Sequence, residues 1–139
     1  LMDADSLEQI LVVLEKKLVS DFQANAITIR LFDKDKKLSN MPDKVIQMDD
    51  PALAPFENFF RSGRPLCGRL QHEQLQHLFS EETAKDIMSA VLMPLGNSSE
   101  LGMVAIGSNN KDRFHPGMGT VFLRQMGALI TGMLKRHLK

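Results

Sequence analysis

The sequence predicts an α+β fold, in which helices cover a mainly antiparallel sheet, from three observations. Patterns of amphipathic helices occur at both ends of the chain, with runs typical of strands between them. Residues 89–95 and 101–108 are strong strand runs, and the short link between them is rich in turn-forming residues, which favours antiparallel pairing. Long amphipathic helices at the two ends would then cover one face of the sheet.

The first element in the chain is a helix expected over about residues 5–22. Asp5 and Glu8 have the spacing of a capping box, and apolar residues then recur with helical periodicity. The next run, residues 26–32, alternates in the manner of a strand. Ile27, Ile29 and Leu31 are expected on one face of this strand, and Thr28, Arg30 and Phe32 on the other.

The middle of the chain predicts shorter elements. A weak strand is expected around Leu38 or after it. Residues 39–55 contain three prolines and are expected to form a loop with one strand near residues 45–48. Residues 56–62 then predict a short helix that ends at Gly63.

The second half continues with a strand over residues 65–70 and two helical segments, residues 71–79 and 81–87, with Ser80 as a cap between them. After the two strong strands, a final helix is expected over about residues 116–138. The succession of elements is therefore helix, strands, short helices, strand hairpin and long helix.

Composition excludes several classes of protein. The length of 139 residues predicts one domain, residues 1–139, and 17 basic residues balance 17 acidic ones, which is unlike a nucleic-acid-binding protein. No apolar run is long enough to span a bilayer, so no membrane association is expected. Cys67 is the only cysteine, which favours a reducing, cytoplasmic location. Because the chain begins with Leu1, further sequence is expected upstream.

From Ser89 onward the chain resembles the C-terminal half of GAF domains. The resemblance lies in Ala-Val-Leu-Met-Pro-Leu at 90–95, the strand 101–108 after a turn, and Arg-Phe at 113–114 before a long helix. The residues themselves are consistent with this: Gly102 is expected to let two strands approach at a hairpin end, and Phe114 to fill the base of the last helix.

More narrowly, four segments look like a bacterial domain-of-unknown-function family, number 484, whose core is GAF-like. They are Pro-Leu-Cys-Gly at 65–68, Met-Pro-Leu at 93–95, Ala-Ile-Gly-Ser at 105–108 and Arg-Phe-His-Pro-Gly-Met-Gly-Thr at 113–120. The resemblance implies a central antiparallel sheet of about six strands, with the terminal helices on one face and a pocket region on the other. It implies no chemistry, because one fold hosts many functions.

GAF domains that bind cyclic nucleotides share an Asn-Lys, Phe, Asp-Glu motif. Asn110, Lys111 and Phe114 match this motif, but Met118 and Gly119 stand where the acidic pair would be. The lysine therefore lacks its carboxylate partner. A solvated loop is the favoured reading, and cyclic nucleotide binding stays as an alternative.

The Pro-Leu-Cys-Gly setting of Cys67 is similar to a cysteine position in GAF-type methionine-sulfoxide reductases. These enzymes need a second cysteine to resolve the sulfenic intermediate, and this chain has none. A buried structural thiol is therefore favoured over a redox enzyme that uses Cys67.

Two further motifs are weighed and set aside. His72 and His77 are five residues apart, whereas two zinc ligands on one face of a helix need a spacing of four, so no metal site is expected. Residues 117–120 precede a helix and have backbone N–H groups suited to an anion, but helix entry explains them better.

These observations lead to a non-catalytic, GAF-like regulatory or ligand-sensing module that dimerises through its terminal helices, with ligand and cofactor unknown. Arg30 lies on the strand face opposite Ile27, Ile29 and Leu31, and so would point to the pocket side, where it could pair with an anionic ligand or an acidic residue. The expected pocket lies between the sheet and residues 56–79. Its candidate residues are Arg30, Phe59, Phe60, Leu66, Cys67, Leu78 and Phe79. The main alternative is a dimerisation scaffold without a ligand.

Overall fold

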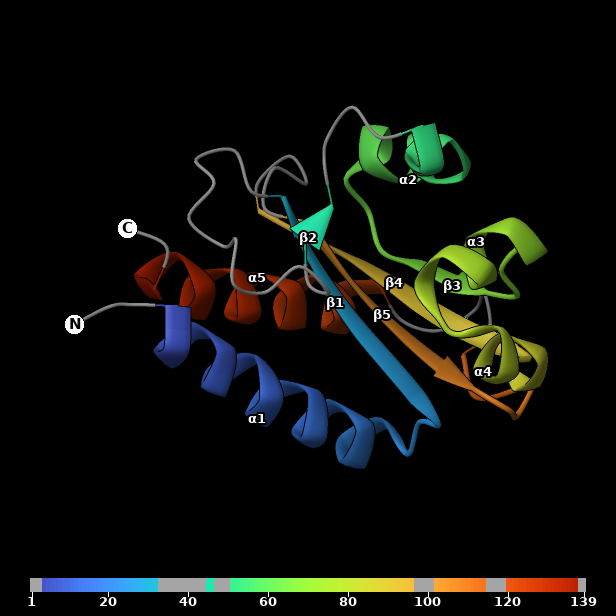
Figure 1. The fold of residues 1–139 in the computed structure, drawn as a ribbon, viewed down its shortest axis with the longest axis horizontal. Coiled ribbons are helices and arrows are strands. Elements are labelled where there is room, and N and C mark those ends of the chain that lie inside the picture. The colour runs from blue at the N-terminus through green and yellow to red at the C-terminus, as the bar shows by residue number, and fades with distance from the viewer. Residues whose placement is uncertain (1–3, 33–44, 47–50, 97–101, 115–119, 138–139) are drawn as a thin grey trace.

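The computed structural model describes residues 4–32, 45–46, 51–96, 102–114 and 120–137. Within these residues the chain forms a five-stranded sheet in the order β2-β1-β5-β4-β3, with helices on both faces (Figure 1). The predicted α+β class is thus confirmed. None of the helices in the described part of the chain is both long enough and apolar enough to cross a membrane.

The sheet contains β1 (Ala26–Phe32), β2 (Val45–Ile46), β3 (Leu66–Gly68), β4 (Ser89–Leu95) and β5 (Gly102–Ser108). Strands β1, β5, β4 and β3 pair in antiparallel fashion, as predicted, whereas β2 runs parallel to β1. A parallel neighbour needs a connection of about a dozen residues or more, and the segment between β1 and β2 is long enough. The described residues contain five strands, so the expected number of about six is not confirmed, and the strand expected near Leu38 lies outside them.

The two long helices, α1 (Ala4–Phe22) and α5 (Thr120–His137), agree with the helices predicted at the two ends. Helix α1 already includes Asp5, so this residue is not the cap that its sequence spacing suggested. The part of the C-terminal helix expected over residues 116–119 lies outside the described residues.

Four short helices lie between β2 and β4. They are the 3₁₀ helix η2 (Pro51–Phe56) and the α-helices α2 (Glu57–Ser62), α3 (His72–Leu78) and α4 (Glu81–Asp86). Helix η2 falls partly in the segment for which a loop was expected. Pro51 is compatible with this helix because it is the first residue, which needs no backbone donor, whereas Pro55 lies inside it.

Two of these helices have the end signals that the sequence predicted. Ser80 caps α4, and its hydroxyl oxygen accepts a hydrogen bond from the backbone N–H of Thr83 at 3.3 Å. Gly63 ends α2 in the left-handed region, with φ 65°, and its N–H donates to the Phe59 carbonyl.

One face of the sheet packs against α1 and α5, as expected, and we call this packing the terminal-helix core. Each strand contributes every second residue to this core, because successive side chains of a strand point to opposite faces. Each helix contributes residues three or four apart, because these share one side of a helix. Its buried residues are Leu11, Leu14, Leu18, Phe22, Ile29, Leu31, Val91, Met93, Leu95, Val104, Ile106, Phe114, Leu123, Ile130 and Leu134.

The other face packs against the four short helices, and we call this packing the short-helix core. Figure 1 shows α2, α3 and α4 on the side of the sheet opposite α1 and α5. The buried residues of this core are Phe56, Phe59, Leu70, Leu75, Leu78, Phe79, Ala84, Ile87, Ala90, Leu92, Met103 and Ala105. The side expected to hold a pocket is therefore a third layer with its own packed interior.

The backbone of β1 lies very close to Gly102, which pairs with Leu31. A Cβ atom on Gly102 would lie 2.0 Å from the backbone oxygen of Arg30, and φ of Gly102 is +138°. The close approach of two strands expected at Gly102 is present, but the crowded neighbour is β1 and not β4, the other strand of the hairpin.

Candidate functional site

The predicted pocket residues divide into three groups in the structure: buried residues, half-buried residues, and the two residues on β3, Leu66 and Cys67. Phe59, Leu78 and Phe79 are buried and form part of the short-helix core. Arg30 and Phe60 are half-buried at the edge of that core. The space directly beneath residues 56–79 is thus occupied by packed side chains, and the accessible polar chemistry lies at its edge.

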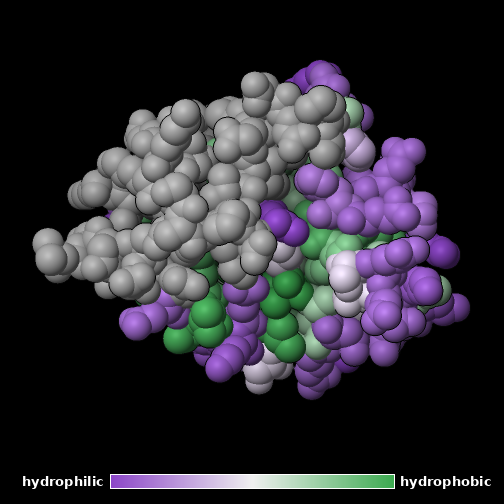
Figure 2. All heavy atoms as spheres, in the orientation of Figure 1, coloured by the Kyte–Doolittle hydropathy of each residue, from purple (hydrophilic) through white to green (hydrophobic). Residues whose placement is uncertain are grey.

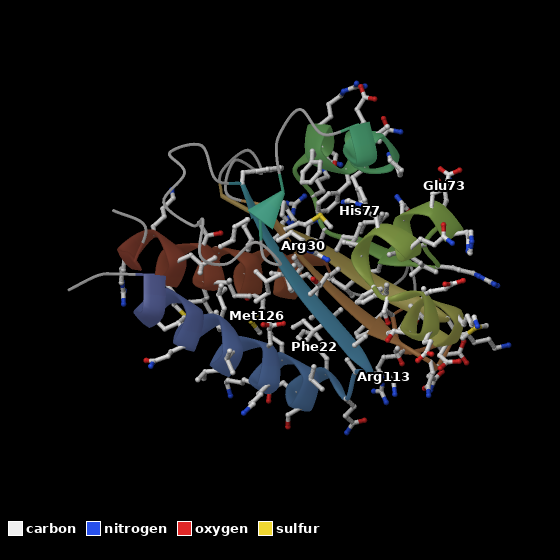
Figure 3. All side chains as sticks on the ribbon, viewed as in Figure 1. Phe22, Arg30, Glu73, His77, Arg113 and Met126 are labelled. Carbon is white, nitrogen blue, oxygen red and sulfur yellow. The ribbon has the colours of Figure 1, made fainter. Side chains whose placement is uncertain are left out.

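Arg30 faces the short helices, as its position on β1 predicted. Its Nη2 atom donates to the backbone carbonyl of Leu78 at 3.5 Å. Because Leu78 ends α3, the guanidinium lies between the sheet and the last turn of that helix (Figure 3). A guanidinium keeps its positive charge in proteins.

Aromatic rings adjoin this position in a continuous series. Phe32, two residues after Arg30 on the same face of β1, has its ring centroid 5.4 Å from that of Phe60. The ring of Phe60 is 6.4 Å from that of Phe56, which in turn is 5.6 Å from the imidazole of His77. We call the half-buried residues Arg30, Phe32, Phe60 and His77 the Arg30 rim.

Helix α3 is held in place against η2 by Gln74, a buried polar residue. Its Oε1 atom accepts from the backbone N–H of Gln71 at 2.9 Å, and its Nε2 atom donates to the carbonyl of Pro55 at 2.8 Å. Because both the oxygen and the nitrogen of the side-chain amide are hydrogen-bonded, burial of Gln74 costs little free energy. His77 is one turn further along the helix, so Gln74 also sets the position of His77 against Phe56.

Sequence reasoning missed three residues of this region. Phe32 could have been found, because the alternation of β1 already placed it on the same face as Arg30. His77 was considered only as a metal ligand, and Gln74 only as part of a helix. Gln74 lies three residues after Gln71, the N-cap of α3, which is the spacing of a capping box. This spacing is the pattern that could have identified Gln74 from the sequence.

Cys67 is not brought together with the Arg30 rim, contrary to the expected pocket. It pairs with Val91 and packs against the terminal-helix core, so it lies on the opposite face of the sheet. The expected strand, residues 65–70, has only three residues in the structure, and the alternation of so short a strand could not be read from the sequence. Burial raises the pKa of the Cys67 thiol above its ordinary value, which disfavours the reactive thiolate at neutral pH.

Leu66 pairs with Leu92 and so belongs to the correct face, but it lies on the edge strand and is exposed. The strand order places β3 three steps from β1, about 14 Å at the usual strand spacing. The structure therefore does not bring Leu66 to Arg30.

The loop that resembles the cyclic-nucleotide motif has a structural role. The hydroxyl of Ser89 donates to the carbonyl of Asn110 at 2.6 Å and accepts from the N–H of Phe114 at 3.2 Å. Lys111 is exposed, and residues 117–119 lie outside the described part of the chain. Hydrogen bonding to the buried Ser89 accounts for the conformation of this loop.

Metal-ligating side chains do not gather in the described residues: no three of the types His, Cys, Asp and Glu lie close enough to hold an ion. His72 is exposed, and His77 packs against Phe56, so each has a different environment. What the Arg30 rim offers is one permanent cation beside an apolar surface of half-buried rings that are tilted to one another. Such a surface suits a ligand with an anionic group and a planar or apolar body.

Comparison with known proteins gives one family. The family model described as "Protein of unknown function, DUF484" matches residues 1–139, the whole chain. No curated protein matches the chain.

Proposed function

The chain belongs to the DUF484 family of proteins of unknown function, and from its structure we propose that it is a non-catalytic, GAF-like regulatory module that senses a small ligand at the Arg30 rim. The observation that carries the proposal is the half-buried guanidinium of Arg30 between β1 and the end of α3. Support for the GAF-like fold comes from the β4–β5 hairpin and from the two terminal helices on one face of the sheet.

The ligand class follows from the chemistry of the rim. A carboxylate or phosphate group would accept charge-assisted hydrogen bonds from Arg30, and an apolar body would rest on Phe32 and Phe60. We propose the edge of the short-helix core for the ligand, because Phe59 and Phe79 belong to the packed interior of this core.

A non-catalytic role is supported by what the rim contains. Arg30 has a side chain that does not transfer protons at physiological pH. The one thiol of the chain, Cys67, lies on the other face of the sheet with a raised pKa. The rim therefore has groups that bind and orient a ligand, and no pairing of a nucleophile with a base.

The sheet gives a direct route from the rim to the terminal helices. Arg30 faces the short helices, while Ile29 and Leu31 on either side of it are buried against the terminal-helix core. A movement of β1 on ligand binding would therefore also move side chains that contact the terminal-helix core.

The ligand proposal is tested by native mass spectrometry of protein purified from its own host. Wild-type protein is expected to carry a small bound mass that is released on denaturation. Arg30→Met should lose this mass, because methionine keeps an unbranched apolar stem but lacks the guanidinium and its charge-assisted bonds. Arg69→Met, at an exposed arginine in the loop after β3, is the matched control and should keep it. Retention of the mass by Arg30→Met, or its absence from wild type, contradicts the proposal.

Dimerisation through the terminal helices is the second part of the proposal. Val13 on α1 is 63% exposed and Leu129 on α5 is 66% exposed, and both lie on the side of their helix away from the sheet. Figure 2 shows hydrophobic residues at the surface over α1, whereas the described surface over α3 and α4 is mostly hydrophilic. These exposed apolar residues also favour the alternative function, a dimerisation scaffold without a ligand.

Sedimentation equilibrium tests the dimer. Wild-type protein is expected to be a dimer, and the double substitution Val13→Glu, Leu129→Glu to be a monomer with an unchanged circular dichroism spectrum, because two buried charges would face each other in a symmetric interface. Leu66→Glu, which places the same charge at an exposed leucine of β3, should remain a dimer. A monomeric wild type contradicts both the proposed dimer and the alternative function as a dimerisation scaffold. A dimer that carries no bound mass favours the scaffold.

A further inference from the structure

A groove of about 390 Å³ lies beside α5, on the opposite face of the sheet from the Arg30 rim. It opens where β3 stops pairing with β4. Leu66 pairs with Leu92, and within the described residues no strand pairs with Pro94 or Gly96 on that edge, where Gly63 and Pro65 line the groove.

The middle of the wall that α5 contributes consists of small residues, namely Gly127, Ala128, Thr131 and Gly132. A Cβ atom on Gly127 would lie 3.2 Å from the carbonyl oxygen of Pro94, so glycine allows the helix to approach β4 closely. A Cβ atom on Gly132 would have no atom within 4 Å. The helix is thus tightly packed at Gly127 and open at Gly132, and the groove follows its open side.

The charged residues of the groove are all of one sign. Arg124 and Lys135 lie near its two ends on the same side of α5, and none of its described lining residues is acidic. Thr131, between them, accepts a hydrogen bond from the N–H of Gly96 at 2.9 Å, which ties the end of β4 to the helix. The groove is therefore a preformed channel with positive charge along one wall.

We propose that this groove binds a short acidic segment of a partner protein in an extended conformation. Arg124 and Lys135 are eleven positions apart, which is about 16 Å along a helix and matches about five residues of extended chain. Acidic side chains of such a segment would meet Arg124 and Lys135, and its backbone would lie against the glycines of α5. The surface lies apart from the Arg30 rim, so a partner and a ligand can be bound at the same time.

The proposal is tested by fluorescence anisotropy with a labelled short peptide in which Glu alternates with Ala. Arg124→Glu is expected to weaken binding roughly fivefold to twentyfold, because it removes one attraction and adds one repulsion. Lys85→Glu, the same change of charge on exposed α4 away from the groove, should change binding less than about twofold. Equal effects of the two substitutions would show a non-specific charge effect and overturn the proposal.

A second variant tests the shape of the groove and excludes loss of folding as the explanation. Gly132→Leu should abolish peptide binding by filling the groove, while the higher helix propensity of leucine keeps α5 intact. Unchanged binding by Gly132→Leu contradicts the site. So does equal binding of a peptide with Gln in place of Glu, or displacement of the peptide by millimolar inorganic phosphate, which would point to a small anion.

Discussion

Gly102→Ala is expected to destabilise the protein by roughly 3 kcal/mol or more, near the upper end for one substitution. The added Cβ atom would lie 2.0 Å from the backbone oxygen of Arg30, so β1 and β5 must separate. The φ angle of +138° adds backbone strain, since residues with a side chain rarely adopt it. Urea denaturation followed by circular dichroism measures the loss as a lower midpoint.

The matched control for this substitution is Gly107→Ala on the same strand. A Cβ atom there would lie 2.8 Å from the Cδ1 atom of Ile87, so side-chain atoms and not backbone atoms have to shift. The expected cost is about 1 to 2 kcal/mol. If both substitutions lower the free energy of unfolding equally, the close approach of the two backbones is not the reason why position 102 needs a glycine.

Phe114→Ala is expected to cost roughly 3 to 5 kcal/mol, the usual range for removal of a fully buried phenylalanine. Phe114 is 0% exposed, and its ring centroid lies 6.0 Å from that of Phe22 at the end of α1. The cavity left by the substitution would border the terminal-helix core at the point where α1 meets the loop after β5. Chemical denaturation of both proteins measures the difference.

Phe60→Ala serves as the comparison for Phe114, because this ring is only half-buried at the Arg30 rim. Phe60→Ala should lower the free energy of unfolding by less than half as much as Phe114→Ala, because folding removes less apolar surface of Phe60 from water. A loss as large as that of Phe114→Ala would mean that Phe60 belongs to the core, and the rim would then offer no surface to a ligand.

Much of the fold could be predicted because its signals are local. The alternation of residues 26–32 predicted a strand and its two faces, the apolar run 89–95 predicted a strand, and Ser80 and Gly63 marked helix ends by their own chemistry. The stripes of apolar residues on the two long helices also predicted that both would cover the sheet.

The parts that failed depend on partners far away in the sequence. Strand β2 has only two residues, and these do not indicate the direction in which it runs relative to β1. Its parallel pairing with β1 could therefore not be predicted from the sequence. Cys67 was assigned to the wrong face because its strand is three residues long. Phe59 and Phe79 were expected to line a pocket, but apolar residues that line a pocket and those that fill it have the same pattern in a sequence.

The pairing of β1 with β5 has a consequence for the order in which the protein forms during synthesis. The ribosome completes residues 26–32 early, yet their antiparallel neighbour, residues 102–108, emerges only after some seventy further residues. Until then the apolar side of this strand can rest only against α1. Such distant pairing slows folding and leaves an open strand edge in the nascent chain, where it can be captured by chaperones or by other copies.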